Sequence, residues 1–204
     1  MYLVTGSSFA ALSFQFMRAK RTISRIIAET TVAVWSTLQS LFMPSPNEAK
    51  WSHNAERYLK LLNLPSCIAA TDGKHIHVKC SPKCGSLYFN HKGYFLVVLL
   101  ACADANALFT TIHVRDFGKN SDGSMFTAST LGKMLETEGP YILCPASLPT
   151  GDSGETSPHY LVADEASPLK VNLMRPYARR MLINKRPIFN YRLSHAQKSV
   201  ECAF

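Results

Sequence analysis

Several β-rich runs follow one another in the middle of the chain, and they constrain the fold more than any other feature. Short apolar or alternating runs, separated by turn residues, occupy residues 67–71, 75–80, 94–105 and 108–114. This length and spacing are typical of successive strands in an antiparallel meander. A further β-rich run, YLVADEA, comes much later, at residues 160–166. With helical patterns on both sides of these runs, the sequence predicts an α/β fold.

The N-terminal part shows helical periodicity twice. Phe9, Leu12 and Phe16 have helical spacing, and a second periodic segment runs from Ile23 to residue 41. Thr22 is the expected cap of this second helix. Two helices joined by a short turn outline a helix-turn-helix, although any small helical bundle gives the same period. In that motif the start of the second helix enters the DNA major groove, so we expect the basic residues there to contact DNA; they include Arg21 and Arg25.

Prolines and an asparagine suggest a boundary after this helical part. The stretch MPSPNEAKW at 43–51 is predicted to be a linker, followed by a short helix at 56–62. We therefore expect a helical region over residues 1–60 and a second domain over 61–204. Within the second domain a helix is expected at 121–135 and a Pro/Gly/Ser-rich loop at 144–159.

The last segment, IFNYRLSHAQKSVECAF, is predicted to be an amphipathic helix. One side carries the apolar residues Leu193, Ala196, Val200 and Phe204. Another side carries a polar stripe, spaced by four, three and four residues: Asn190, Ser194, Gln197 and Glu201.

The charge of the chain favours a polyanionic partner. Lys and Arg number 22 against 14 Asp and Glu, which gives a net charge of +8. The basic residues gather between positions 170 and 198, and those expected to hold a DNA backbone are Arg175, Arg179, Arg180, Lys185 and Arg186. A solvated helix or loop surface gives the same pattern. No membrane span is expected, because the longest apolar stretch, 94–103, is about half the necessary length.

Three acidic residues end or line separate predicted elements. Asp72 and Asp164 follow strand-like runs, and Glu201 lies on the polar stripe of the last helix. Carboxylates on separate rigid elements suit divalent cations, which take oxygen ligands and can activate water at a phosphodiester. We expect Gly73 to allow a sharp turn there and Lys74 to meet a phosphate. A turn-forming Asp and a solvated Glu remain the alternative interpretation.

At these residues the sequence resembles the PIF/Harbinger transposases and the nucleases derived from them, in the DDE superfamily endonuclease group. The matching stretches extend over most of the chain: YLVTGSSFAALSFQF, RTISRIIAET, PNEAKW, IAATDGKHI, GSLYFNHKGYF, FGKNSDGSMF, VADEASPLK, LMRPY and FNYRLSHAQKSVECAF. The resemblance implies a ribonuclease H-like core, a mixed sheet flanked by helices, that cuts DNA with Mg²⁺ or Mn²⁺. It also implies that Asp72, Asp164 and Glu201 are the catalytic and metal-binding triad.

Two departures from the family pattern favour an alternative. The family usually carries Arg four residues before the Glu, where this chain has Gln197, and the family pattern continues beyond Phe204. We therefore expect a domain truncated at its C-terminus. The alternative function is a catalytically inactive, transposase-derived protein that binds DNA or another partner.

Remaining expectations concern neighbours of the triad and the cell. His75 is expected to support Asp72, and Gln197 to lie behind the triad. His75 and His77 with Cys80 and Cys84 give a competing zinc interpretation, with unusual spacing for structural zinc. Family resemblance implies the nucleus, DNA and a Myb-like partner protein; a homodimer is left open. The acid-free first 28 residues also suit a mitochondrial transit peptide.

Overall fold

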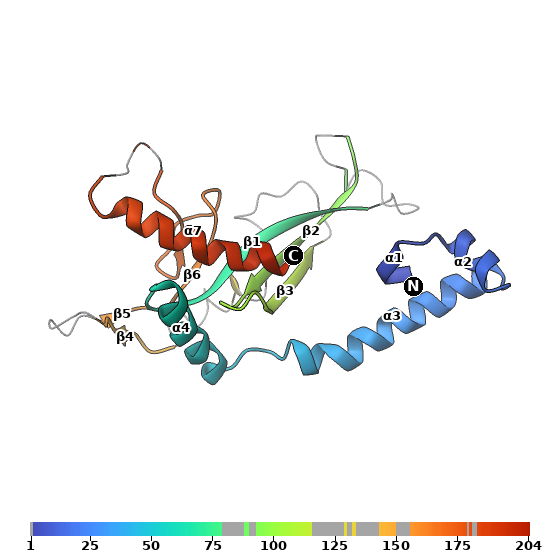
Figure 1. The fold of residues 1–204 in the computed structure, drawn as a ribbon, viewed down its shortest axis with the longest axis horizontal. Coiled ribbons are helices and arrows are strands. Elements are labelled where there is room, and N and C mark those ends of the chain that lie inside the picture. Colours follow the sequence, from blue (N-terminus) through green and yellow to red (C-terminus); the bar gives the residue numbers. More distant parts are fainter. Residues whose placement is uncertain are drawn as a thin grey trace. The chain divides into compact units, whose positions relative to one another are not determined.

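The computed structural model describes residues 2–78, 88–89, 93–115, 129, 132–133, 143–149, 156–178, 180 and 183–204. Contacts divide the chain into two compact units, Met1–Pro44 and Ser45–Phe204. The ribbon is drawn in Figure 1. The helix predicted at 121–135 falls almost wholly outside the described residues.

The first unit is helical. It contains α1 (Tyr2–Thr5), α2 (Phe9–Gln15) and the long α3 (Lys20–Phe42). Ser8 caps α2 by accepting a hydrogen bond from Ala11 N at 3.1 Å. Leu12 and Ile23 are the buried apolar residues of α2 and α3. The prediction that Thr22 caps the second helix is wrong, because α3 begins two residues earlier, at Lys20, and its N-cap position is Ala19.

The second unit begins with α4 (Glu48–Leu62), which is longer than predicted. The predicted linker is wrong from residue 47 onward, because Asn47 accepts a hydrogen bond from Lys50 N at 2.9 Å and starts the helix. Trp51 and Tyr58, 1% and 0% exposed, anchor α4 in the core. The division between units therefore lies at residue 44 rather than 60. The helix ends as predicted at Asn63, in the left-handed conformation.

A five-stranded mixed sheet forms the centre of this unit. Its strands are β1 (Cys67–His77), β2 (Leu96–Ala103), β3 (Phe109–Arg115), β6 (Tyr160–Val162) and β7 (Leu173–Met174), in the order β3-β2-β1-β6-β7. β1 to β3 are antiparallel neighbours, which confirms the meander, whereas β6 and β7 run parallel to β1. Two short strands, β4 (Ala146–Ser147) and β5 (Thr156–Ser157), pair separately in the predicted loop.

β1 is continuous where a strand end was predicted. Asp72 pairs with Ala101 and Gly73 with Leu100 inside the β1–β2 ladder. The predicted sharp turn at Gly73 is therefore wrong, and Asp72 is a strand residue rather than a turn former. The ladder overrides the local signal, because every residue from Ala70 to His77 has a register partner on β2.

The two faces of the sheet carry separate apolar clusters. Alternate residues of β2 and β6 belong to opposite clusters: Ala101 and Val162 to one, Cys102 and Leu161 to the other. The last helix, α7 (Arg186–Ala203), covers the face of Ala101 and Val162. Figure 1 shows α7 lying alongside β1. This α/β arrangement, a mixed sheet flanked by helices, is compatible with a ribonuclease H-like core.

The predicted apolar side of α7 is confirmed. Leu193, Ala196 and Val200 are at most 1% exposed and pack in the cluster beneath α7. Cys67 and Cys102 are buried free thiols. None of the described helices is long and apolar enough to cross a membrane.

Candidate functional site

The parallel pairing of β1 with β6 aligns two of the predicted acidic residues. Ala70 on β1 is level with Val162 on β6. Continuing this register by two residues places Asp72 level with Asp164, just beyond the end of β6. Both lie on the α7 face, because Ala70 and Val162 belong to the cluster that α7 covers. Each residue is of intermediate exposure.

A turn after β6 fixes the Asp164 carboxylate. Its Oδ1 accepts hydrogen bonds from Ser167 N at 3.1 Å and from Ser167 Oγ at 2.8 Å. Arg175 holds the same turn from outside, donating to the carbonyls of Glu165 and Ser167 at 3.0 and 3.2 Å. The site therefore receives a carboxylate of defined orientation. A serine three residues after an aspartate is a recognisable turn signal that sequence analysis missed.

The polar stripe of α7 forms one wall of a pocket beside Asp164. The pocket has a volume of about 340 Å³, and its polar lining residues are Asp164, Glu165, Tyr177, Asn190, Ser194 and Gln197. Tyr177 lies on the opposite wall, and Asn190 of α7 holds it in place. The Asn190 side chain accepts a hydrogen bond from Tyr177 N and donates one to Tyr177 O, both at 2.9 Å. Three residues of the predicted stripe, Asn190, Ser194 and Gln197, thus line the pocket.

Gln197 joins α7 to β1 next to Asp72. Its Nε2 donates to the Thr71 carbonyl at 3.1 Å, and the side chain is buried. At the end of the helix, Lys74 Nζ lies 5.3 Å from the centre of the Phe204 ring. This part of α7 therefore follows β1 from Thr71 to Lys74, the stretch that contains Asp72.

Glu201 lies on α7 between these two contacts. It follows Gln197 by one helical turn and precedes Phe204 by three residues, so it shares their side of the helix. Its side chain is exposed. Within the described part of the chain, no three His, Cys, Asp or Glu side chains are grouped closely enough to hold a metal ion.

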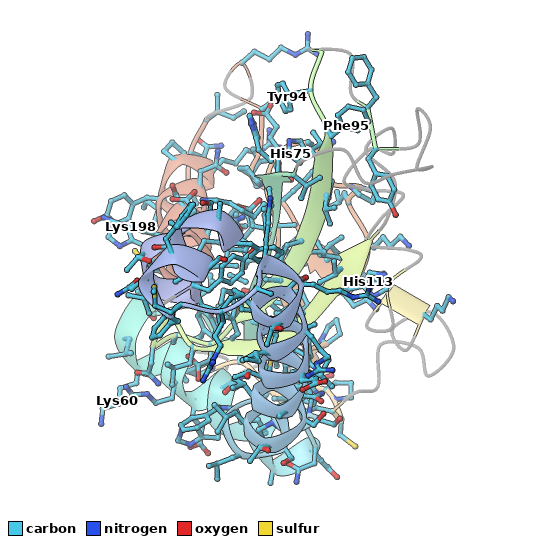
Figure 2. The ribbon with its side chains drawn as sticks, turned by 90° about the vertical axis from the view of Figure 1, so that its right-hand side faces the viewer. Lys60, His75, Tyr94, Phe95, His113 and Lys198 are labelled. Carbon is cyan, nitrogen blue, oxygen red and sulfur yellow. The ribbon has the colours of Figure 1, made fainter. Side chains whose placement is uncertain are left out.

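The other predicted neighbours lie around this site. Lys74 is exposed and on the same face as Asp72, whereas His75 lies on the opposite face, level with Val98. Figure 2 shows His75 and Tyr94 at the end of the sheet remote from Lys60 of α4. His77, of the competing zinc interpretation, stacks on Tyr94 with ring centres 4.0 Å apart. Cys80 and Cys84 lie outside the described residues.

The predicted DNA-binding residues are exposed to different extents. Arg21 and Arg25 are exposed on α3, where Arg25 pairs with Glu29 at 3.8 Å. Near α7, Arg180 and Lys185 are exposed. Arg175 contacts the turn after Asp164, and Arg186 lies 4.8 Å from the centre of the Tyr177 ring. Arg179 lies outside the described residues.

The donor chemistry of the site fits a hard divalent cation. Carboxylate and amide oxygens of the β6 turn and α7 line the pocket beside Asp164, and Asp72 lies on the same face of the sheet. Such oxygens are the ligands that Mg²⁺ and Mn²⁺ prefer. In particular, Gln197, which lines the pocket together with Asp164, has a buried Oε1 without a hydrogen-bond partner in the described structure.

The second unit is thus a mixed sheet flanked by helices, compatible with a ribonuclease H-like core, with Asp72 on β1, Asp164 just beyond the end of β6 and Glu201 on α7. Comparison with known families agrees: a match to the DDE superfamily endonuclease family covers residues 71–204, and the chain belongs to that family. No curated protein and no solved structure matches the chain.

Proposed function

We propose that this chain is a divalent-metal-dependent DNA endonuclease of the transposase type, with Asp72, Asp164 and Glu201 as its metal ligands. The observation that carries the proposal is the β1–β6 register of Ala70 with Val162, which, when it is extended by two residues, brings Asp72 level with Asp164 on the face that α7 covers. Membership in the DDE superfamily endonuclease family supports nuclease chemistry, with DNA as the substrate.

The cation would be held by carboxylate oxygens from three separate elements. When bound, it supplies a Lewis acid that activates water and stabilises charge on the phosphate. Ser167 orients Asp164, and the Gln197–Thr71 hydrogen bond keeps α7 against β1 beside Asp72. Lys74, exposed on the same face, would neutralise a phosphate oxygen of the DNA. Hydrolysis of the phosphodiester would free a 3′ hydroxyl, which a transposase uses for strand transfer.

The test is nicking of supercoiled plasmid with Mn²⁺ by the whole chain and by Asp72→Asn, Asp164→Asn and Glu201→Gln. We expect nicking by the wild type and background levels from the three variants, because each loses a charged metal ligand. Glu56→Gln is the matched control, since it removes an exposed carboxylate on α4 that does not line the pocket. Equal nicking by all proteins would identify a contaminating nuclease.

A wild type that binds DNA without cutting it would favour the catalytically inactive alternative. Gln197, in place of the family's usual Arg, is the sequence feature that makes this outcome worth testing. Catalysis by the wild type that depends on all three carboxylates would exclude it.

We further propose that the chain derives from the PIF/Harbinger branch and acts in the nucleus. The stretches TDGKHI, VADEASPLK and SVECAF support this branch. A Myb-like partner protein, and a second copy of this chain, are the partners to test by co-purification. A nuclear-localisation assay of the tagged chain would contradict the proposal if the protein accumulated in mitochondria.

We also propose that the α2–α3 pair binds DNA as a helix-turn-helix. Its support is the short connection between the helices, residues 16–19, and the exposed Arg21 and Arg25 at the start of α3. Arg21→Ala with Arg25→Ala should weaken DNA binding and reduce its salt dependence. An unchanged salt dependence would place the phosphate contacts elsewhere.

A further inference from the structure

Only one of the two polar atoms of the Gln197 side-chain amide has a hydrogen-bond partner in the described structure. Its Nε2 donates to the Thr71 carbonyl at 3.1 Å, whereas its Oε1 is buried with no hydrogen-bond partner in the described structure. The residue is only 9% exposed. A buried carbonyl oxygen without a partner is unfavourable, so a group that pairs with Oε1 would be bound favourably.

The pocket that Gln197 lines has oxygen acceptors and no basic side chain among its lining residues. Asp164 Oδ1 already accepts two hydrogen bonds from Ser167, and no partner of Oδ2 is found among the described residues. The amide of Asn190 is fully used by the Tyr177 backbone. The nearby Arg175 donates to carbonyls of the turn instead.

A ligand that satisfies this pocket must be an electron-pair acceptor or a donor of hydrogen bonds, and it must tolerate negative charge. A divalent cation meets both conditions, because hard cations accept neutral amide oxygens together with carboxylates. Water alone would leave the charge of Asp164 and Glu165 uncompensated.

We propose that Gln197 Oε1 is a neutral oxygen ligand, together with Asp164, for the divalent cation of this site. The inference rests on the proposed function and adds a residue to it. One side chain then has two tasks: Nε2 fastens α7 to β1, and Oε1 binds the ion. The metal affinity of the site therefore depends on the oxygen at position 197, separately from the hydrogen bond to Thr71.

Two substitutions separate these tasks. Gln197→Met and Gln197→Glu both remove the Nε2 donor, so both lose the hydrogen bond to Thr71. Only Gln197→Glu keeps an oxygen at this position. Ser194→Glu is the matched control for charge, because it adds the same carboxylate one turn earlier on the pocket wall, at an exposed position.

The measurement is Mn²⁺ binding to the whole chain without DNA, from the electron paramagnetic resonance signal of free Mn²⁺. Gln197→Met should bind Mn²⁺ about tenfold more weakly than the wild type, and Gln197→Glu at least as tightly as the wild type. Ser194→Glu should change the Mn²⁺ affinity only slightly from that of the wild type. This change should be much smaller than the difference in affinity between Gln197→Glu and Gln197→Met. Thermal melts in EDTA should show a loss of stability for both Gln197 variants, since both lack the bond to Thr71, and the larger loss for Gln197→Glu, which also buries a carboxylate without a partner.

Equal Mn²⁺ affinity of Gln197→Met and wild type would overturn the inference. So would equal gains from Gln197→Glu and Ser194→Glu, because added charge would then explain both. A wild type that nicks DNA and binds Mn²⁺ while Gln197→Met binds it equally well removes only this inference. A wild type with neither Mn²⁺ binding nor nicking removes the proposed function as well.

Discussion

Removal of one hydroxyl group, in Tyr58→Phe, should destabilise the whole second unit. Tyr58 is fully buried, and its hydroxyl accepts from Ala70 N at 3.1 Å and donates to Ala103 O at 3.0 Å. The same oxygen lies 2.9 Å from Ser199 Oγ on α7. A single oxygen thus joins α4, β1, β2 and α7. Burial raises the pKa of Tyr58 far above its ordinary value, so the group remains protonated.

The size of the effect follows from what the substitution leaves behind. Phenylalanine fills the same volume, so no large cavity forms and little apolar burial is lost. Two buried backbone groups, Ala70 N–H and Ala103 C=O, lose this partner, at a cost of about 1–3 kcal/mol for each group left unsatisfied. We expect the free energy of unfolding to fall by about 3 kcal/mol in total.

Urea unfolding followed by tryptophan fluorescence measures this change. Trp51 is 1% exposed in the core of the second unit, whereas Trp35 on α3 is 50% exposed. A Trp35→Phe background leaves Trp51 as the only reporter. With a denaturant slope of about 2 kcal/mol/M, the midpoint should move by about 1.5 M.

Tyr160→Phe is the matched control. Tyr160 is 6% exposed and belongs to the same apolar cluster, but its hydroxyl makes no hydrogen bond within the described structure. Its loss should change stability by less than about 0.5 kcal/mol. If both variants lose equally little stability, the hydrogen bonds of Tyr58 do not hold the four elements together and the reasoning is wrong.

Three further outcomes are expected. Burial raises the pKa of the Cys67 and Cys102 thiols. The folded chain therefore keeps protons that the unfolded chain releases above about pH 8.5. Urea titrations should show the free energy of unfolding falling as the pH rises beyond that value. Asp104→Ala should lower the free energy of unfolding by about 2 kcal/mol in the same assay, because Asp104 Oδ1 accepts hydrogen bonds from two backbone N–H groups. Lys50→Ala removes only the half-exposed ion-pair partner of Asp104, at 3.2 Å, and should lower it by less than about 1 kcal/mol. DNA affinity of the whole chain should fall steeply with salt, measured by fluorescence anisotropy; a flat dependence would contradict binding through the basic residues near α7.

Elements with a strong local pattern were predictable from sequence. The meander of β1 to β3, the strand before Asp164 and the buried side of α7 all follow from apolar periodicity, which burial enforces residue by residue. The polar stripe of α7 was also visible as spacing. Its assignment to one wall of the pocket needed the structure, because spacing does not tell whether a polar side faces solvent or a site.

Errors occurred where a tertiary contact overrides a local signal. Pro44, Pro46 and Asn47 suggested a linker, yet Asn47 starts a helix because Trp51 and Tyr58 find places in the core. Gly73 suggested a turn, yet β2 supplies a partner strand through that position. In both cases long-range packing and pairing outweigh the intrinsic preference of a few residues.

The sequence by itself determined which side chains of this protein are available for chemistry: two aspartates after apolar runs, a glutamate on an amphipathic helix, and an excess of basic residues. Only the tertiary structure decided which of them lie together. Asp72 and Asp164 are 92 residues apart in the chain, and the parallel pairing of β1 with β6 sets Ala70 and Val162, two residues before each of them, level with one another. Gln197 meets Thr71 across 126 positions. Such proximity depends on strand register and helix packing, which are set by the burial of the whole core and are not encoded in any one segment.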